Sequence, residues 1–447
     1  MSAPVVDEIM LTPAFRRHSP FLKCEGVCEM ARLVIEGLHR LSGAVTIHGA
    51  KNSALPVLAA TLLVGGTSEI CNCPALSDVE ASVSILRYLG CRVERSDGCV
   101  TVDASGLSKS DIPDHLMREM RSSIVFLGAI IARTGQAHMS FPGGCELGPR
   151  PIDLHLSALR RLGVVIEEER GQLHCRVGSG LKGANITLAF PSVGATENIL
   201  LAAVLAEGTT VIRNAAREPE IEDLCSFLNA CGARIAGAGE STITIEGVDH
   251  LTGCHHNVIP DRIETATYMA AAAVTGGSLV LRHTNPEHVA SIFPPFEEAG
   301  CHIACWKDEM LISSPARLRQ IKSVRTMPYP GFPTDAQAPV MSMASVADGT
   351  SVFIENIFEN RYKHAGELLR LGARIKIEGR VAVVEGVPVL SGAPVECTDL
   401  RGGAALVVAG LAAEGQTEIT ELHHLDRGYE RLEESLREAG AVVRREE

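Results

Sequence analysis

A cysteine in a glycine-rich loop is the first candidate for chemistry in this sequence. The segment SFPGGCELGPRP, residues 140–151, places Cys145 among glycines and prolines, five positions before Arg150. The glycines permit large backbone changes and the prolines delimit the segment, which is typical of an active-site lid. Beside Arg150 and Arg121, a thiol can act as a nucleophile or a proton donor. The alternative is an unreactive turn cysteine, although Cys145, unlike the other cysteines, lies in no strand or helix pattern.

Cations recur at the starts of helical segments. The Ala-rich segments begin with Lys51 and Asn52, Arg121, Arg262 and Arg401, and a second set of helices is expected to open with Asp78, Arg150, Arg361 and Arg427. A lysine or arginine in a first turn opposes the helix dipole, whereas the free N–H groups there bind anions. One such arginine alone is usually a solvated surface charge. The whole set at equivalent positions predicts a site for phosphate or carboxylate groups.

Two further helix starts carry residues of a different kind. Ser192, Val193 and Gly194 lie in the segment SVGAT, and Asp335 lies in YPGFPTDAQAP. Asp335 is an anion among cations. Its position is compatible with an ordinary helix N-cap and also with a general base that takes a proton from a hydroxyl group beside the anion site. Both interpretations stay open on the sequence.

A repeated unit must position these residues. Segments such as LRYLGCRVERSDGCVTVDA (86–104) and LLRLGARIKIEGRVAVVEG (368–386) each read as a helix end, a glycine stop, a strand, a turn and a second strand. Six such units, each with an Ala-rich helix upstream, recur about every 65 residues. Because a helix that is apolar all round must be covered on all sides, we expect an α/β fold of two lobes, each of three repeats, with a cleft between them. Two unrelated α/β domains are the alternative.

Composition limits the class of protein. The chain has 447 residues, of which 46% are hydrophobic and only 4% aromatic, so small aliphatic side chains must build its core. A net charge of −13 argues against a general binder of nucleic acid or of anionic membranes. No apolar run reaches the length of a membrane span, and the first thirty residues lack the apolar core of a signal peptide. We therefore expect a cytoplasmic protein.

The fourteen cysteines do not form a recognisable metal motif. Cys24 and Cys28 form one close pair and Cys71 and Cys73 another, but no second pair follows either at zinc-finger spacing. Most other cysteines lie in apolar or strand-like contexts, where a free thiol is a small core residue. We therefore expect reduced thiols and no metal site.

Eight motifs in order resemble those of one enzyme family. They are GAKNSALP, PGGCELGPRPIDLHL, PSVGATENI, VIPDRIETAT, GFPTDAQA, FENRY, TDLR and DRGYERLEE. With them the chain, from about residue 33 to its end, resembles the UDP-N-acetylglucosamine 1-carboxyvinyltransferases, enolpyruvyl transferases of the EPSP synthase superfamily. The resemblance implies an inside-out α/β barrel with one lobe at 52–259, a second lobe at 33–51 plus 260–447, and an N-terminal extension at 1–32.

The resemblance also implies a reaction. The enolpyruvyl group of phosphoenolpyruvate would pass to the 3-hydroxyl of UDP-N-acetylglucosamine with release of phosphate, the first committed step of peptidoglycan synthesis. Such an addition needs an acid at the methylene carbon and a base at the hydroxyl, followed by elimination of phosphate. The cationic cluster would stabilise the leaving phosphate. No metal or organic cofactor is required, and the expected partners are these two small molecules.

The motifs carry the family's site residues over to this chain. Cys145 would donate the proton and Asp335 would accept one, with Lys51 and Arg427 also catalytic. The phosphoenolpyruvate contacts would be Lys51, Asn52, Arg121, Arg401 and Arg427. The nucleotide-sugar contacts would be Arg150, Pro151, Ile152, Asp153, Leu154, Ser192, Val193, Gly194, Asp335, Ile357 and Arg361. One departure is Phe190, because some family members have a lysine at this position, two residues before the serine of the SVG motif.

Three other functions compete with this one. A transferase acting on shikimate 3-phosphate is disfavoured by the lid cysteine and by GAKNSALP. A paralogue acting on a different uridine nucleotide is compatible with the motifs. A non-catalytic sensor of UDP-N-acetylglucosamine would have no need for the full set of Lys51, Cys145, Asp335 and the arginines.

Overall fold

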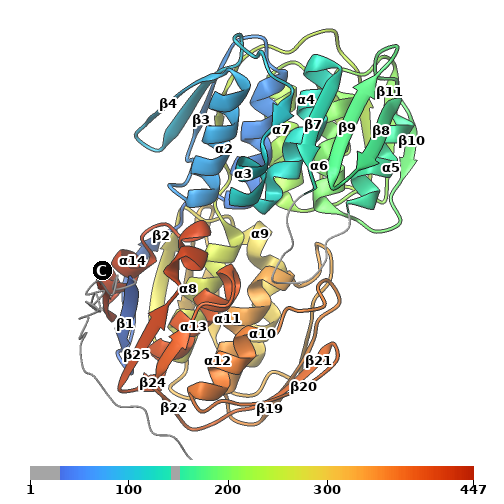
Figure 1. Cartoon of the computed structure of the whole chain (residues 1–447). Coiled ribbons are helices and arrows are strands. Elements are labelled where there is room, and N and C mark those ends of the chain that lie inside the picture. Colours follow the sequence, from blue (N-terminus) through green and yellow to red (C-terminus); the bar gives the residue numbers. More distant parts are fainter. Residues whose placement is uncertain (1–30, 142–151, 447) are drawn as a thin grey trace, which may run out of the picture.

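A computed structural model describes residues 31–141 and 152–446 of the chain (Figure 1). The predictions made for residues 1–30 of the N-terminal extension, for Cys145, Arg150 and Pro151, and for the cysteine pair of Cys24 and Cys28 therefore lie outside the described residues. The extension was expected to reach residue 32, but Arg32 already begins the first strand.

Six four-stranded sheets are present in the described part of the chain, together with one two-stranded sheet. Three of the four-stranded sheets are β14 (His255–Asn257), β3 (Thr67–Cys71), β5 (Cys99–Asp103) and β4 (Arg92–Ser96); β6 (Asp111–Ile112), β7 (Gln136–Ser140), β9 (Gln172–Val177) and β8 (Val164–Glu169); and β10 (Asn185–Thr187), β11 (Thr209–Arg213), β13 (Thr242–Glu246) and β12 (Arg234–Ala236). The other three are β2 (Ser42–Thr46), β15 (Ser278–Arg282), β17 (Glu309–Ser313) and β16 (His302–Cys305); β18 (Ser323–Arg325), β19 (Thr350–Ile354), β21 (Val381–Glu385) and β20 (Arg374–Glu378); and β23 (Pro394–Glu396), β25 (Gln416–Thr420), β1 (Arg32–Glu36) and β26 (Val442–Glu446). The small sheet pairs β22 (Leu390–Ser391) with β24 (Ala413–Glu414).

All six large sheets share one pairing pattern. The first strand of each, in the order given above, runs parallel to the second, and the remaining two pairs are antiparallel. In five sheets the last two strands are consecutive along the chain and form a hairpin. In the sixth sheet, the last two strands are β1 and β26, which lie at opposite ends of the described chain. The pairing thus requires the N-terminal strand to complete the C-terminal sheet.

The helices fall into two sets. The Ala-rich helices are α1 (Lys51–Ala60), α4 (Phe126–Thr134), α6 (Val193–Ala203), α8 (Arg262–Val274), α11 (Thr334–Ser345) and α13 (Leu400–Leu411). Helices of the second set, mostly amphipathic, are α2 (Ser77–Leu89), α5 (Asp153–Arg161), α7 (Pro219–Ala230), α12 (His364–Arg370) and α14 (Leu432–Glu438). Shorter helical segments are α3 (Asp114–Glu119), α9 (Pro286–Val289), α10 (Phe293–Glu298), η1 (Thr61–Leu63), η2 (Arg121–Val125), η3 (Ala290–Ile292) and η4 (Leu422–Arg427).

The Ala-rich helices lie inside two hydrophobic cores. In α13 every residue from Arg401 to Leu411 is buried, as expected for a helix without a polar face. α11 packs against both α8 and α13, and α4 packs against both α1 and α6. Buried residues between Ala50 and Val258 form one core, while those at 33–47 and 263–443 form the other. Figure 1 shows the two bodies one above the other, with the blue strand β1 beside the red C-terminal elements.

Three expectations from the sequence need correction. Arg361 lies in the turn before α12, which begins at His364, and Arg427 ends η4, well before α14. Neither arginine is therefore the first residue of the amphipathic helix that was expected to begin with it. The expectation of reduced thiols is also wrong at one place, because Cys71 and Cys99 form a disulfide between β3 and β5. In the described ranges, no helix combines the length and the apolar character that crossing a membrane needs.

Candidate active site

A buried carboxylate joins two of the predicted site cations. Asp78, at the start of α2, accepts a hydrogen bond from Lys51 Nζ at 3.0 Å and from Arg427 Nε at 2.9 Å. Lys51 is the first residue of α1, where the first backbone amides have no partner within the helix. Lys51 and Asp78 are both almost fully buried, whereas a third of the Arg427 side chain is exposed. The three side chains form a compact ionic group at the junction of the two cores.

The charges in this group shift one another's protonation. Burial is the main cause that lowers the pKa of Lys51, and nearby Arg401 and Arg427 add to it, while Asp78 opposes them. Burial alone would raise the pKa of Asp78, but Lys51 and Arg427 outweigh it and hold that pKa below its ordinary value. Asp78 is therefore ionised at neutral pH, and Lys51 lies where a second anion would be favoured.

A second carboxylate is held between two arginines. Arg361 Nη2 donates to Asp335 Oδ1 at 2.9 Å, and Arg401 donates from Nε and Nη2 to Asp335 Oδ2 at 3.2 Å. Both guanidinium groups are buried, whereas the Asp335 side chain is 28% exposed. Asp335 is thus fixed in position by its partners and still open to solvent, as a group that meets a substrate must be.

Asp335 is not a helix cap. Pro333 is the N-cap residue of α11 and makes no side-chain capping bond, while Asp335 is the second residue inside the helix. The N-cap interpretation that the sequence left open is therefore wrong. Arg361 also donates to the carbonyl oxygen of Thr334, so the start of α11 and the turn before α12 are bound together.

A tyrosine, Tyr429, holds Arg401 in place through a hydrogen bond. Arg401 Nη1 donates to Tyr429 Oη at 3.1 Å, and that hydroxyl also lies 2.8 Å from Thr267 Oγ1 on α8. Burial alone would lower the pKa of Arg401, but Tyr429 and Asp335 outweigh it and raise the pKa. Arg401 is thus a permanent cation, and its guanidinium group is oriented by Tyr429 and Asp335.

The two ionic groups lie near one another. Arg401 contributes directly to the lowered pKa of Lys51, although the two residues belong to different cores. Contacts across the junction hold this arrangement. The amide of Ala75 donates to Glu430 at 2.6 Å, and Arg262 on α8 donates to Glu220 on α7 at 2.9 Å. The helix-start cation Arg262 is therefore engaged with a carboxylate from the other core.

Residues of the predicted nucleotide-sugar site form a separate group around α5 and α6. Ser192 caps α6 by accepting from the amide of Ala195. At Gly194 an added Cβ atom would lie 2.9 Å from the His155 ring, so the two segments approach closely here. His155, in turn, lies two positions after Asp153, at the start of α5. Phe190 is 43% exposed, and its carbonyl oxygen accepts from the Ser192 amide.

Other predicted residues lie at several places in the described structure. Ile357 lies after β19, where its amide donates to Glu355 Oε1 at 2.8 Å. Asn52 follows Lys51 in α1, and Val193 begins α6. Ile152 and Leu154 flank Asp153 at the start of α5. Arg121 begins η2, but nothing is described of its side chain.

Sequence reasoning missed two residues of the ionic groups. Asp78 was noted only as a helix start, and its acidic type gave no signal for a role among cations. Tyr429 belongs to the motif DRGYERLEE, two positions after Arg427, so the motif carried a signal that was not used.

Comparison with known proteins gives one consistent result. The profile of EPSP synthase (3-phosphoshikimate 1-carboxyvinyltransferase) matches residues 35–436. A protein of Caldanaerobacter subterraneus subsp. tengcongensis, "UDP-N-acetylglucosamine 1-carboxyvinyltransferase 2", is 52% identical over 93% of this chain and 99% of its own. "UDP-N-acetylglucosamine 1-carboxyvinyltransferase" of Dichelobacter nodosus is 49% identical over the same shares.

Solved structures agree with the fold. The enolpyruvyl transferase NikO from Streptomyces tendae superposes with a TM-score of 0.84 at 27% identity, covering 93% of this chain and 99% of its own. EPSP synthase from Acinetobacter baumannii superposes with a TM-score of 0.72 at 20% identity, covering 94% of this chain and all of its own. The second similarity is evidence for the α/β fold alone.

Proposed function

From the premise that this chain belongs to the EPSP synthase family, we infer that it is a transferase that moves the enolpyruvyl group of phosphoenolpyruvate to the 3-hydroxyl of UDP-N-acetylglucosamine and releases phosphate. Relatives about half identical over 93% of the chain carry the name of this activity. The reaction belongs to peptidoglycan synthesis. The cytoplasmic location expected from the sequence stays a prediction.

The observation that carries this function is the position of Asp335. Its carboxylate is held by Arg361 and Arg401, yet 28% of the side chain is open to solvent. Two guanidinium groups favour the ionised carboxylate, which is the form that accepts a proton from a hydroxyl. Lys51 and Arg427 lie close by, joined through Asp78. A base beside a group of cations is what addition of an alcohol to an anionic enol substrate requires.

Phosphoenolpyruvate is proposed to bind at the cations. Lys51, Arg121, Arg401 and Arg427 neutralise its phosphate and carboxylate groups, and Asn52 adds a hydrogen bond. Lys51 and Arg427 act on the phosphate as it leaves, because cations held in place before the reaction stabilise the charge that develops. Cys145, outside the described residues, supplies the proton to the methylene carbon.

The nucleotide sugar is proposed to bind toward α5, α6 and β19. Residues 150–154 and 192–194, with Ile357 and Arg361, surround it so that the 3-hydroxyl reaches Asp335. The oxygen of this hydroxyl forms a bond to the central carbon of the enol while Asp335 takes its proton and Cys145 protonates the methylene. Loss of a proton from the new methyl group with departure of phosphate then restores the double bond.

The architecture behind this site is proposed to be an inside-out barrel of two lobes, with boundaries 52–259 and 33–51 plus 260–447. Each lobe comprises three pseudo-symmetric repeats. The common pairing pattern of the six large sheets supports the repeats, and the two hydrophobic cores support the two lobes. Residues 1–31 are proposed to form an extension outside both, since Arg32 already belongs to β1.

Phosphate release measures the proposed activity directly. The purified full chain is mixed with phosphoenolpyruvate and, in parallel, with UDP-N-acetylglucosamine, UMP or shikimate 3-phosphate. We expect phosphate release with the first acceptor and a product that contains the enolpyruvyl ether. Release only with shikimate 3-phosphate, or no release with any acceptor, would overturn the assignment and favour the corresponding alternative.

A further inference from the structure

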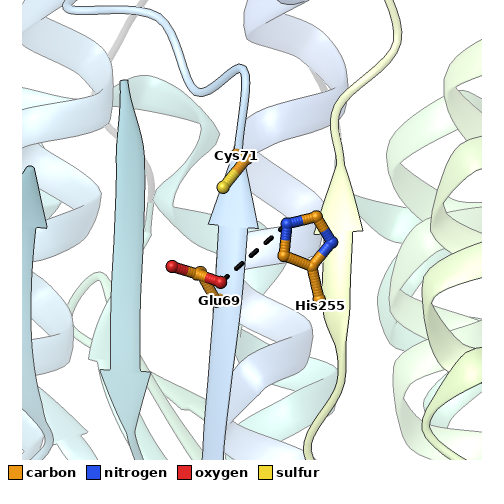
Figure 2. A group of neighbouring side chains, drawn as sticks. All are labelled: Glu69, Cys71 and His255. Atoms are coloured by element: carbon orange, nitrogen blue, oxygen red, sulfur yellow. Dashed lines mark ion pairs between the residues drawn. The ribbon is translucent and has the colours of Figure 1, made fainter. Parts of the chain in front are cut away.

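The outer face of one sheet brings three potential metal ligands together, and a fourth, Cys99, is bonded to one of them. In the sheet of β14, β3, β5 and β4, Glu69 on β3 pairs in register with His255 on β14, and Cys71 lies two positions further along β3. Antiparallel pairing of β3 with β5 brings Cys99 opposite Cys71, where the two form the disulfide. Figure 2 shows Glu69, Cys71 and His255 side by side, and one ligand atom from each lies within 4.8 Å of the others.

Strand geometry explains why these side chains share a face. Along β3, Ser68 and Ile70 point into the core, so Glu69 and Cys71 point outward. On β14, His256 is buried and His255 points outward. The side chains of Glu69 and His255 are 51% and 55% exposed, so an ion from solvent can reach both. A sheet fixes neighbouring strands about 5 Å apart. The central strand β3 therefore holds Glu69 and Cys71 next to His255 on one side, and Cys71 next to Cys99 on the other.

The donor set is that of a zinc site. Zinc is bound by cysteine thiolate, histidine nitrogen and carboxylate oxygen, with four ligands in structural sites. Glu69 and His255 already lie 3.9 Å apart as an ion pair, but an exposed pair of this kind contributes little to stability. The weak ion pair of Glu69 and His255 therefore does not explain why Cys71 lies next to it.

We propose that Cys71, Cys99, His255 and Glu69 bind one zinc-class divalent ion when the cysteines are reduced, and that the disulfide and the bound ion exclude each other. A dithiol reductant opens the Cys71–Cys99 bond by thiol–disulfide exchange, supplying two electrons and two protons and leaving as its own disulfide. The ion then displaces the two thiol protons. In the reverse direction, after the ion has left, a small-molecule disulfide takes two electrons and two protons from the two thiols. It leaves as two thiols while the Cys71–Cys99 bond re-forms.

Neighbouring thiols do not offer an equivalent set. Cys73 lies two positions after Cys71 but is buried. Cys254 precedes His255, and its sulfur lies 3.3 Å from that of Cys231. Among the described cysteines, Cys71 is therefore the one grouped with His255 and Glu69, and Cys99 is bonded to it.

Cobalt(II) titration of the full chain tests the site, because cobalt replaces zinc and its spectrum reports both thiolate ligation and tetrahedral geometry. The protein is titrated after dithiol reduction and removal of the reductant, and again after oxidation by a small-molecule disulfide. We expect one cobalt per chain, with a thiolate-to-cobalt charge-transfer band, in the reduced sample alone. Zinc should displace the cobalt.

Variants separate this site from the other cysteines. The double variant Cys71→Ser and Cys99→Ser should lose the charge-transfer band. His255→Ala and Glu69→Gln, which leave the disulfide intact in the oxidised protein, should each weaken binding at least about tenfold, since even changes behind a ligand cost this much. Cys305→Ser, at an exposed thiol on β16, and Thr101→Ala, at the position paired with Glu69, should bind as the original chain does. Unchanged cobalt binding in the double-cysteine variant, or none in the reduced original, would overturn the proposal.

Discussion

Arg427 donates from Nε to the carboxylate of Asp78 at 2.9 Å, although 349 positions of sequence separate the two residues. Asp78 belongs to α2, beside the first core, and Arg427 ends η4 in the second. The same carboxylate accepts from Lys51 at 3.0 Å. One buried anion thus fixes the spacing of two cations that we assign to phosphoenolpyruvate, so their geometry depends on how the two cores meet.

Replacing Asp78 with asparagine should destabilise the protein. The change leaves Lys51 and Arg427 close together without the anion between them, and removal of one partner from a buried ion pair costs about 3 kcal/mol or more. Urea unfolding at pH 7, followed by circular dichroism, measures the loss. Glu80→Gln on the same helix is the control, because its exposed pair with Arg95 should cost no more than about 1 kcal/mol. Equal effects of the two changes would contradict the buried role of Asp78.

Replacing Asp335 with asparagine should separate binding from chemistry. Asparagine fills the same space but cannot take the hydroxyl proton, so kcat should fall by about 10²- to 10⁴-fold. The KM values for both substrates should change far less, because Arg361 and Arg401 remain. Steady-state kinetics with each substrate varied in turn gives both quantities. Asp348→Asn, an exposed carboxylate after the same helix, is the matched control. A variant of Asp335 that turns over normally would remove this residue as the base.

Helices were predictable from the sequence where their signal is local. Each Ala-rich segment is apolar on every side and ends near a glycine, so its helix could be located before the fold was known. Strand pairing has no local signal of this kind. The pairing of β1 with β26 and of β14 with β3 joins distant segments, and only the closed fold determines it.

The same distinction applies to the site. Lys51, Arg401 and Asp335 were predicted because they stand at helix starts or in motifs. The role of Asp78 was not, because it depends on partners 27 and 349 positions away. The Cys71–Cys99 disulfide escaped notice for a similar reason, since only the register of β3 with β5 brings the two residues together.

Cys145→Ser should abolish most of the turnover and the labelling by thiol-directed epoxides such as fosfomycin. The physical reason is that an epoxide reacts with a thiolate. Burial raises the pKa of several described cysteines, to about 11 for Cys91 and Cys175 and to about 12 for Cys225 and Cys397, so these thiols stay protonated. Mass spectrometry of the labelled chain, combined with phosphate-release assays, measures both effects.

The exposed thiol of Cys305 provides the control for that experiment. Cys305→Ser should keep both turnover and labelling, because Cys305 is not among the residues that we assign to the site. If labelling persists in Cys145→Ser and disappears in Cys305→Ser, the reactive thiol has been assigned to the wrong residue.

The pH dependence of stability should carry a contribution from Glu197 on α6. Burial, assisted by the nearby charges of Glu220 and Glu218, raises the pKa of Glu197 from 4.5 to about 8. Between these two values the folded protein holds a proton that the unfolded chain has lost, so the free energy of unfolding falls as pH rises through this window and levels off above it. One pKa unit corresponds to about 1.4 kcal/mol, which makes several kcal/mol the upper bound of this contribution.

Glu197→Gln should therefore remove part of that fall, because glutamine stays neutral at every pH. Urea unfolding at pH 6 and at pH 9 gives the free energy of unfolding for the original chain and for the variant. The variant should lose less stability between the two values, while Glu240→Gln, at an exposed carboxylate of the same core region, should follow the original chain. The comparison is a difference of differences, so acids that do not interact with Glu197 cancel from it. Parallel losses in the Glu197 variant and the original chain would show that Glu197 is ionised in the folded protein at pH 6.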